Sequence, residues 1–253
     1  FSTANTVTVS SYSLTFSAIE NVTGGSANDS FVFVGGGSLA GSLTGGAGTD
    51  TLDYSTYGSG VTVNLVLGSA TAIGGGANGR VSGIENLTGS AYNDSLTGST
   101  GDNVITGNGG NDVLAGNAGN DTYVFASGFG SDTIVEAASA GTDTLDFTAV
   151  TQNLTFLLGS TALTGGYDSA NQISASGLNL ERLLSGSGSD LFTFSAGGSF
   201  NGTLNGGTGT DTLGYHLYTS GATVNLAGGS ATGTSGVSGF ENIIGSAYAD
   251  SLT

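Results

Sequence analysis

Residues 89–124 read GSAYNDSLT GSTGDNVIT GNGGNDVLA GNAGNDTYV, which is four nonapeptides placed end to end. Each nonapeptide begins with glycine, carries Asp or Asn at its sixth position and has an apolar residue at its eighth position. A glycine-rich turn followed by a short strand with one inward apolar side chain accounts for this spacing. The run therefore predicts short strands joined by tight turns, repeated at a fixed interval.

The same pattern recurs outside the central run. Seven further copies occupy residues 24–32, 45–53, 127–135, 138–146, 185–193, 206–214 and 245–253. Position eight is apolar in every copy, although only 37% of the chain is hydrophobic. These residues are Phe31, Leu52, Leu96, Ile105, Leu114, Tyr123, Ile134, Leu145, Phe192, Leu213 and Leu252. The sequence thus predicts a core made of one ladder-like set of side chains.

Acidic residues are concentrated at position six of the copies, which holds ten of the fourteen aspartates of the chain. Together with Asp102, the residues at this position form the predicted set of metal ligands. The set is Asp29, Asp50, Asp94, Asp102, Asn103, Asp112, Asp121, Asp132, Asp143, Asp190, Asp211 and Asp250.

The central run resembles the calcium-binding repeats of the RTX (repeats-in-toxin) family, in particular the long secreted adhesins and surface proteins of that kind. The resemblance implies a right-handed parallel β-roll with two nonapeptides in each coil. It further implies export through a type I secretion system and folding outside the cell, where calcium is abundant.

Two nonapeptides in a coil would stack Asp94 on Asp112 and Asn103 on Asp121, at the strand spacing of about 4.8 Å. Two carboxylates at that distance repel by roughly 1 kcal/mol in water and by about 3 kcal/mol at an effective dielectric constant of 20. Calcium removes this repulsion because it accepts several oxygen ligands in flexible geometry. Calcium is therefore the predicted cofactor, whereas zinc lacks its usual Cys and His ligands here.

Two groups of acidic residues allow more than one interpretation. Asp29, Asp50, Asp190, Asp211 and Asp250 lie outside the central run, and a hydrogen-bonded Asx turn explains them nearly as well as a metal site. Four glutamates precede a motif aspartate by one nonapeptide; for these we favour solvated side chains on ordinary strands over calcium ligands. They are Glu20, Glu85, Glu181 and Glu241.

The charge of the chain excludes several classes of partner. Nineteen acidic residues face only two arginines and no lysine, giving a net charge of −17. Nucleic-acid binding needs a basic surface and is not expected. No stretch reaches the roughly 18 apolar residues of a membrane span, so membrane insertion is not expected either. Cations are the natural partners of such a chain.

The extended segments are short, rich in β-branched residues and bounded by glycine, which predicts an all-β chain. Residues 20–71 also match residues 181–232, so longer modules flank the central run. We expect one continuous parallel β-solenoid over residues 1–253, with long-module coils at 1–88, a nonapeptide block at 89–146 and long-module coils at 147–253.

We expect no enzymatic activity, because the single histidine, His216, aligns with Ser55 of the matching module and no nucleophile motif is present. The favoured function is a calcium-stabilised extracellular segment of a surface protein or filament used in adhesion, matrix or surface-layer structure. The alternative is a non-catalytic secretion and folding module of an extracellular enzyme. The opening segment, residues 6–21, has the pattern of half a module, and the chain stops at the ninth residue of a nonapeptide. We therefore expect end-to-end association or continuation in a longer chain.

Overall fold

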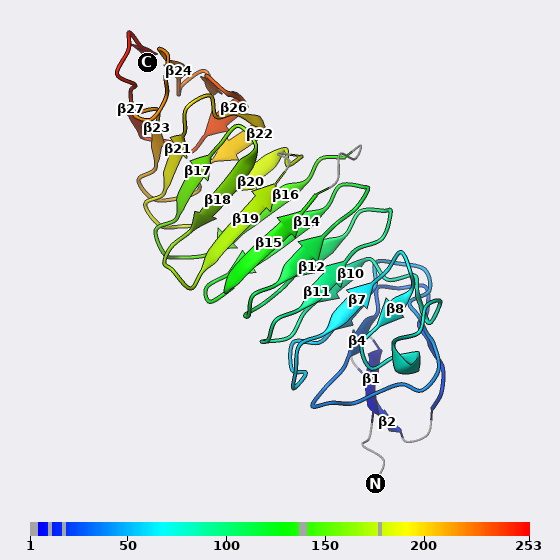
Figure 1. Ribbon diagram of the computed structural model, residues 1–253. Helices are drawn as coiled ribbons and strands as arrows, with labels where there is room; N and C mark the ends of the chain where they lie inside the picture. Colours follow the sequence, from blue (N-terminus) through cyan, green and yellow to red (C-terminus); the bar gives the residue numbers. More distant parts are fainter. Residues whose placement is uncertain (1–4, 10–11, 17–18, 137–140, 177–178) are drawn as a thin grey trace. The chain divides into compact units, whose positions relative to one another are not determined.

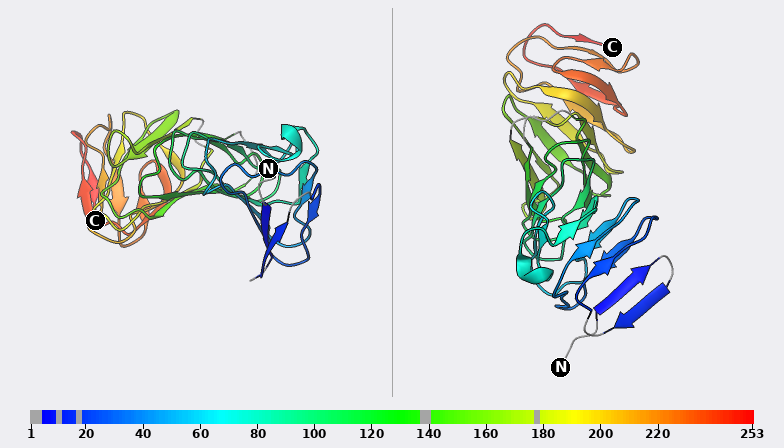
Figure 2. Two further views of the ribbon diagram at one scale, coloured as in Figure 1. Left: turned by 90° about the horizontal axis from the view of Figure 1, so that it is seen from below. Right: turned by 90° about the vertical axis from the view of Figure 1, so that its right-hand side faces the viewer.

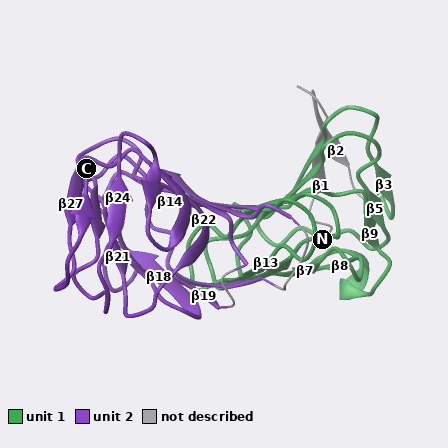
Figure 3. Cartoon of the chain, turned by 90° about the horizontal axis from the view of Figure 1, so that it is seen from above, with its two compact units in different colours: residues 1–121 green, residues 122–253 purple. Residues whose placement is uncertain are grey.

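The computed structural model describes residues 5–9, 12–16, 19–136, 141–176 and 179–253, with side chains from residue 19 onward. Part of the opening segment, 6–21, and the first residues of the copy at 138–146 lie outside the described residues. The chain forms two compact units, residues 1–121 and 122–253 (Figure 3). Each unit is described by itself, and the continuity of the solenoid between them stays a prediction.

Unit 1 contains two main sheets and one small sheet. The first has the order β2 (Tyr12–Phe16), β1 (Asn5–Val9), β4 (Ser30–Val32), β6 (Thr51–Asp53), β10 (Asn86–Thr88) and β12 (Val104–Thr106). The second has the order β13 (Val113–Ala115), β11 (Ser95–Thr97), β7 (Thr62–Asn64) and β8 (Ser69–Ala70). The small sheet contains β3 (Val22–Thr23), β5 (Leu43–Thr44) and β9 (Val81–Ser82). The antiparallel hairpin of β1 and β2 precedes the coils of this unit (Figure 2).

Unit 2 repeats this arrangement with longer strands. One sheet has the order β14 (Thr122–Ala126), β16 (Thr144–Ala149), β20 (Arg182–Leu184), β22 (Phe200–Asn205) and β26 (Thr234–Ser238). The other has the order β27 (Asn242–Ile244), β23 (Thr212–Gly214), β21 (Leu191–Phe194), β17 (Thr155–Leu158), β18 (Ala162–Gly166), β19 (Gln172–Ser176) and β15 (Ser131–Val135). The small sheet contains β25 (Ser230–Ala231), β24 (Thr223–Asn225) and β28 (Ser251–Leu252). The strands β15, β19, β18 and β17 lie side by side in Figure 1.

The coils stack in parallel register, so that equivalent positions of successive repeats face each other. In unit 1, Leu96 pairs with Leu114 and Leu87 pairs with Ile105. In unit 2, Phe192 pairs with Leu213. Parallel stacking of equal positions is what a solenoid of repeats requires. The all-β parallel solenoid is thereby confirmed.

The position-eight side chains form the core, as the sequence predicts. Ten of the eleven are at most 2% exposed, from Phe31 at 2% to Leu213 at 0%. The exception is Leu252, which is 39% exposed on the edge strand β28. Most three-residue strands therefore bury one apolar side chain between two outward ones, which explains why glycine-rich turns can follow so closely.

The internal repeat of the sequence is also a structural repeat. The hairpin of β7 and β8 pairs Val63 with Ala70, and the hairpin of β24 and β25 pairs Val224 with Ala231. The hydroxyl of Tyr215 donates to the backbone oxygen of Thr232 at 2.7 Å. Its counterpart Tyr54 likewise donates to the Thr71 backbone oxygen. Each module therefore buries a tyrosine whose polar end is satisfied by the following hairpin.

Helical structure among the described residues is limited to the 3-10 turn η1 (Gly74–Gly76). None of the described helical segments has the length and apolar character that crossing a membrane demands.

The burial of the position-eight side chains predicts that truncating two of these leucines lowers the free energy of unfolding by different amounts. Leu213→Ala removes a fully buried side chain and should lower the free energy of unfolding by about 2–5 kcal/mol. Leu252→Ala is the matched control, with an expected loss of about 1 kcal/mol or less because its side chain is partly exposed. Urea unfolding in calcium measures both. Equal shifts of the unfolding midpoint would contradict the ladder.

Candidate metal centre

The position-six side chains point inward and stack from coil to coil. In unit 1, the backbone N–H of Asp29 donates to Oδ1 of Asp50 at 2.8 Å, and the N–H of Asp50 donates to Oε2 of Glu85 at 2.7 Å. Asp29 and Asp50 are 5% and 0% exposed. We call such a series of stacked side-chain oxygens and backbone N–H groups a carboxylate column.

The central nonapeptides form two such columns on opposite sides of their coils. The N–H of Asp94 donates to Oδ1 of Asp112 at 2.8 Å, and the N–H of Asn103 donates to Oδ1 of Asp121 at 2.8 Å. The strand register agrees, because Ser95 pairs with Val113. The predicted stacking of Asp94 on Asp112 and of Asn103 on Asp121 is confirmed.

Unit 2 contains its own columns. The N–H of Leu154 donates to Asp190 at 2.7 Å, the N–H of Asp190 donates to Asp211 at 2.7 Å, and the N–H of Asp211 donates to Oε2 of Glu241 at 2.8 Å. Asp250 lies apart from this series, because its Oδ1 accepts the N–H of Ala222 at 2.7 Å. Asp250 is therefore stacked on an alanine, which supplies a backbone N–H but no side-chain oxygen.

The glutamates take the place of position-six aspartates in the wide coils. Glu85 and Glu241 accept the N–H groups of Asp50 and Asp211, and Oε2 of Glu181 accepts the N–H of Asp143 at 2.8 Å. Glu85 and Glu181 are half-buried and Glu241 is exposed, so the choice between solvated side chains and calcium ligands stays a prediction, while the hydrogen bonds to the neighbouring coil are an addition to it. The signal that could have revealed this was already in the sequence, because each glutamate aligns with position six of a degenerate nonapeptide.

Glycine at position one leaves room for the carboxylate. A β-carbon on Gly107 would lie 2.3 Å from Oδ2 of Asp112, and one on Gly116 would lie 2.2 Å from Oδ2 of Asp121. Real side chains do not approach so closely, so only glycine fits without a shift. In the four central nonapeptides, the glycine at position one and the Asp or Asn at position six therefore have one steric explanation.

Asp102 at position five, Asp53 at position nine and Asp168, which lies in no copy of the motif, are exposed or only half-buried, unlike the position-six aspartates of the central run. Asp102 is exposed, and its Oδ1 accepts the N–H of Asn120 at 2.7 Å, which holds its pKa below the usual range. Asp53 accepts the N–H of Ser55, and Asp168 accepts that of Asn171. These three side chains stabilise turns at the surface. Asp102 is bonded to Asn120 of the next coil at the surface and does not belong to a column.

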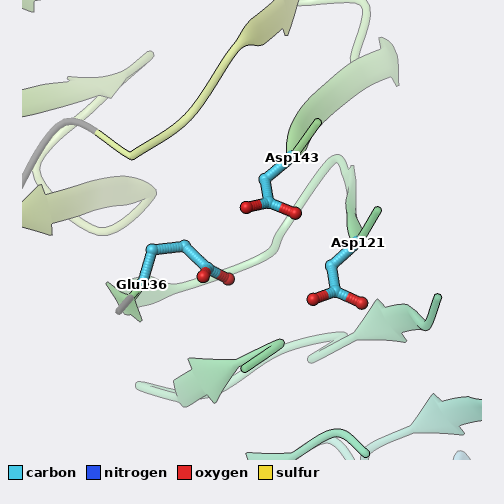
Figure 4. Close-up of side chains that lie close together, drawn as sticks. All are labelled: Asp121, Glu136 and Asp143. Atoms are coloured by element: carbon cyan, nitrogen blue, oxygen red, sulfur yellow. The ribbon is translucent and has the colours of Figure 1, made fainter. Parts of the chain in front are cut away.

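Asp132 and Asp143 of unit 2 are both buried, at 3% and 2% exposure. A carboxylate oxygen of Asp143 lies within 4.8 Å of one of Glu136 (Figure 4). Oε1 of Glu136 accepts the hydroxyl hydrogen of Tyr123. The sequence pattern missed Glu136 because it lies outside every position-six alignment. Asp121, also labelled in Figure 4, is the last residue of unit 1.

Burial makes three aspartates of the columns, Asp94, Asp112 and Asp211, hold protons more tightly. It raises the pKa of Asp112 to about 7, and the nearby charge of Asp94 adds to this rise, while the hydrogen bond from the Asp94 N–H opposes it. Burial also raises the pKa of Asp94 and of Asp211. Binding of a proton or of a divalent cation relieves the same unfavourable buried negative charge.

The residues of the central block fit calcium. The donor atoms are carboxylate, amide and backbone oxygens, which calcium prefers as ligands. The stacked aspartates are buried, and none of them is more than 4% exposed. When bound, the ion would supply positive charge between adjacent coils. Asp94 and Asp112 would hold an ion in one column, and Asp121 would hold an ion in the other.

Comparison with known families agrees with this chemistry. Residues 88–123 match a family model described as the RTX calcium-binding nonapeptide repeat, in four copies. A comparison with curated proteins finds no matching relative. RTX nonapeptide repeats bind calcium ions, so calcium is the cofactor of this segment.

Registered carboxylates predict a strong dependence of calcium affinity on position. Asp112→Ala should weaken calcium binding more than Asp53→Ala or Asp168→Ala, because only Asp112 belongs to a column. Isothermal titration of the three variants measures the difference. Comparable losses from all three would show that bulk negative charge binds the ion.

Folding should depend on calcium at neutral pH. In chelator at pH above 7 we expect a disordered circular dichroism spectrum, and millimolar calcium should restore a β spectrum. The raised pKa of Asp112 means that the folded state binds a proton which the unfolded chain releases between pH 7 and about 4. Stability in chelator should therefore increase as the pH falls through that window.

Magnesium at equal concentration serves as the control for ionic strength. A β spectrum and an unchanged melting temperature in chelator at pH 8 would contradict the calcium requirement. A free energy of unfolding in chelator that decreases as the pH is lowered from 7 to 4 would contradict the role of the buried carboxylates.

Proposed function

We propose that the chain, whose residues 88–123 match the RTX calcium-binding nonapeptide repeat, serves as a calcium-stabilised structural segment of a large secreted surface protein or filament. The observation that carries the proposal is the extent of the carboxylate columns. They include Asp29 and Asp50 in unit 1 and Asp190 and Asp211 in unit 2, all outside the matched repeats. A metal-dependent stack is thus the body of the chain rather than a short appendage.

The location we propose is extracellular. RTX-repeat proteins are typically secreted, and calcium outside cells is concentrated enough to fill such sites, whereas the calcium-free columns carry unfavourable buried charge. Export of an unfolded chain followed by calcium-driven folding fits these properties. The net charge of −17 keeps the chain soluble before the cation is bound.

We propose a non-enzymatic role. The carboxylates that are brought together accept backbone N–H groups in columns, which explains them as structural and metal-binding groups. His216 is exposed and directly follows the buried Tyr215, as Ser55 follows Tyr54 in the other module. The alternative, a non-catalytic folding module of an extracellular enzyme, would use the same calcium chemistry.

End-to-end association is part of the proposal. β27 and β28 are edge strands of unit 2, and Ile244 and Leu252 on them are 43% and 39% exposed. Edge strands with exposed apolar residues pair readily with a further strand. A second copy of this chain, or more of the same polypeptide, would supply it.

Light scattering and electron microscopy in calcium test the structural role. We expect calcium-dependent fibres that dissociate in chelator. Leu252→Lys should suppress them by placing a charge on the edge strand, whereas Leu217→Lys, at an exposed residue outside the strands, should not. A monodisperse monomer in calcium would contradict the filament and favour the enzyme-module alternative.

A further inference from the structure

We propose that unit 2 carries a binding site for a neutral saccharide on the outer face of β17, β18 and β19. The site is an open hollow of about 300 Å³, lined by residues of these strands and of the turn between β18 and β19 (Figure 1). It lies outside the repeats that match the calcium-binding family and contains no carboxylate of a column. The inference goes beyond the proposed structural role and does not depend on it.

Three antiparallel strands form the floor of the hollow. β18 pairs with β17 on one side and with β19 on the other, and the outer two strands pair in parallel with β21 and β15. The hairpins β7–β8 and β24–β25 have a second strand of only two residues. The longer β18 and the additional β19 therefore give this part of unit 2 a broader outer face than either of those hairpins has.

A missing side chain creates the hollow. Phe156 and Ile173 are buried, so the neighbouring residues of β17 and β19 point outward. Gly166 of β18 pairs with Thr155 on one side and with Gln172 on the other. Because glycine has no side chain, the space between these two outward residues stays open to a ligand.

Tyr167 provides an aromatic wall whose position is fixed. Its hydroxyl accepts the N–H of Gly128 at 2.7 Å, and its ring packs edge-on against Phe129 with 5.7 Å between the ring centroids. Leu157, which is 41% exposed, adds a second apolar surface to the hollow. A site with apolar walls and a few polar groups is typical of small-ligand binding, and a ring that is already held in place loses little entropy on binding.

Asp168 places a carboxylate beside this wall. Its Oδ1 accepts the N–H of Ala170 and both the N–H and the side-chain amide of Asn171, at 2.8 to 2.9 Å. Its Oδ2 accepts no hydrogen bond from the described residues. The hydrogen bonds from Asn171 and Ala170 hold the pKa of Asp168 below its usual range, so at neutral pH the group only accepts hydrogen bonds. It can therefore receive a ligand hydroxyl.

Three neutral polar side chains complete the lining. Thr155, Thr164 and Gln172 are exposed, and their side chains make no hydrogen bond to another described residue. A hydroxyl or an amide can both donate and accept. A ligand with several hydroxyl groups, which also donate and accept, matches this set better than a ligand with a single polar group.

Charge and size narrow the class of ligand. Asp168 and the net charge of −17 disfavour an anion, and neither arginine of the chain lines the hollow. A compact ammonium group would pair with Asp168 but would leave Tyr167 and the threonines without a role. The volume of about 300 Å³ is at the lower end of small-molecule sites, which span roughly 300–1,000 Å³. A short neutral saccharide meets these requirements.

Saturation-transfer difference NMR on the full chain in calcium tests the inference, with maltose, cellobiose, lactose and chitobiose as millimolar probes. We expect transfer to at least one disaccharide and none to glucose 6-phosphate or spermidine. Asp168→Asn keeps Oδ1 but removes the charge and should weaken binding roughly tenfold. Thr164→Tyr should abolish binding by filling the hollow with a side chain that suits a strand. Thr203→Tyr, at an exposed residue of β22 in the other main sheet, is the matched control and should leave binding unchanged.

The absence of transfer to all four disaccharides would overturn the inference. Equal binding by Thr164→Tyr and the wild-type chain would also overturn it, and so would preferential binding of spermidine, which would assign the hollow to an amine. Circular dichroism in calcium checks that each variant keeps its β spectrum. If Thr164→Tyr does not, Gln172→Tyr fills the hollow from β19 and takes its place, with the same expected loss of binding.

Discussion

The stacked coils depend on one repeated hydrogen bond, between the backbone N–H of a position-six residue and the side-chain oxygen of the next coil. The bond fixes the register, because it joins equivalent residues such as Asp94 and Asp112. Register then aligns the position-eight side chains, so that Leu96 meets Leu114 in the core. A polar column beside a narrow apolar ladder thus replaces the thick core of a compact globular domain.

The same bond concentrates negative charge where water is excluded. Backbone N–H groups compensate part of that charge, yet burial still raises the pKa of Asp112 to about 7. The stacking of these buried carboxylates is consequently favourable only when protons or cations neutralise their charge. We therefore expect calcium binding and folding to be coupled in this chain.

Glutamate allows coils of different width to share a column. In the wide coils the stacked residue arrives on a segment of another length, and the longer side chain of Glu85 or Glu241 still reaches the aspartate N–H. The buried tyrosines Tyr54 and Tyr215 fill the extra interior of these coils and donate to the hairpin behind them. Wide and narrow coils can therefore alternate without interrupting either the polar or the apolar series.

The sequence by itself determined the all-β repeat, the inward position-eight residues and the stacking of Asp94 on Asp112, because a nonapeptide period translates directly into coil register. It also predicted calcium from the regular spacing of the carboxylates. The alignment of the glutamates with position six was visible in the sequence, but only the tertiary structure decided which aspartate each one meets, since residues as far apart as Asp50 and Glu85 become neighbours through the width of the coil. The tertiary structure likewise decided which outward side chains surround the hollow of unit 2, because strand pairing brings Thr155, Gly166 and Gln172 side by side.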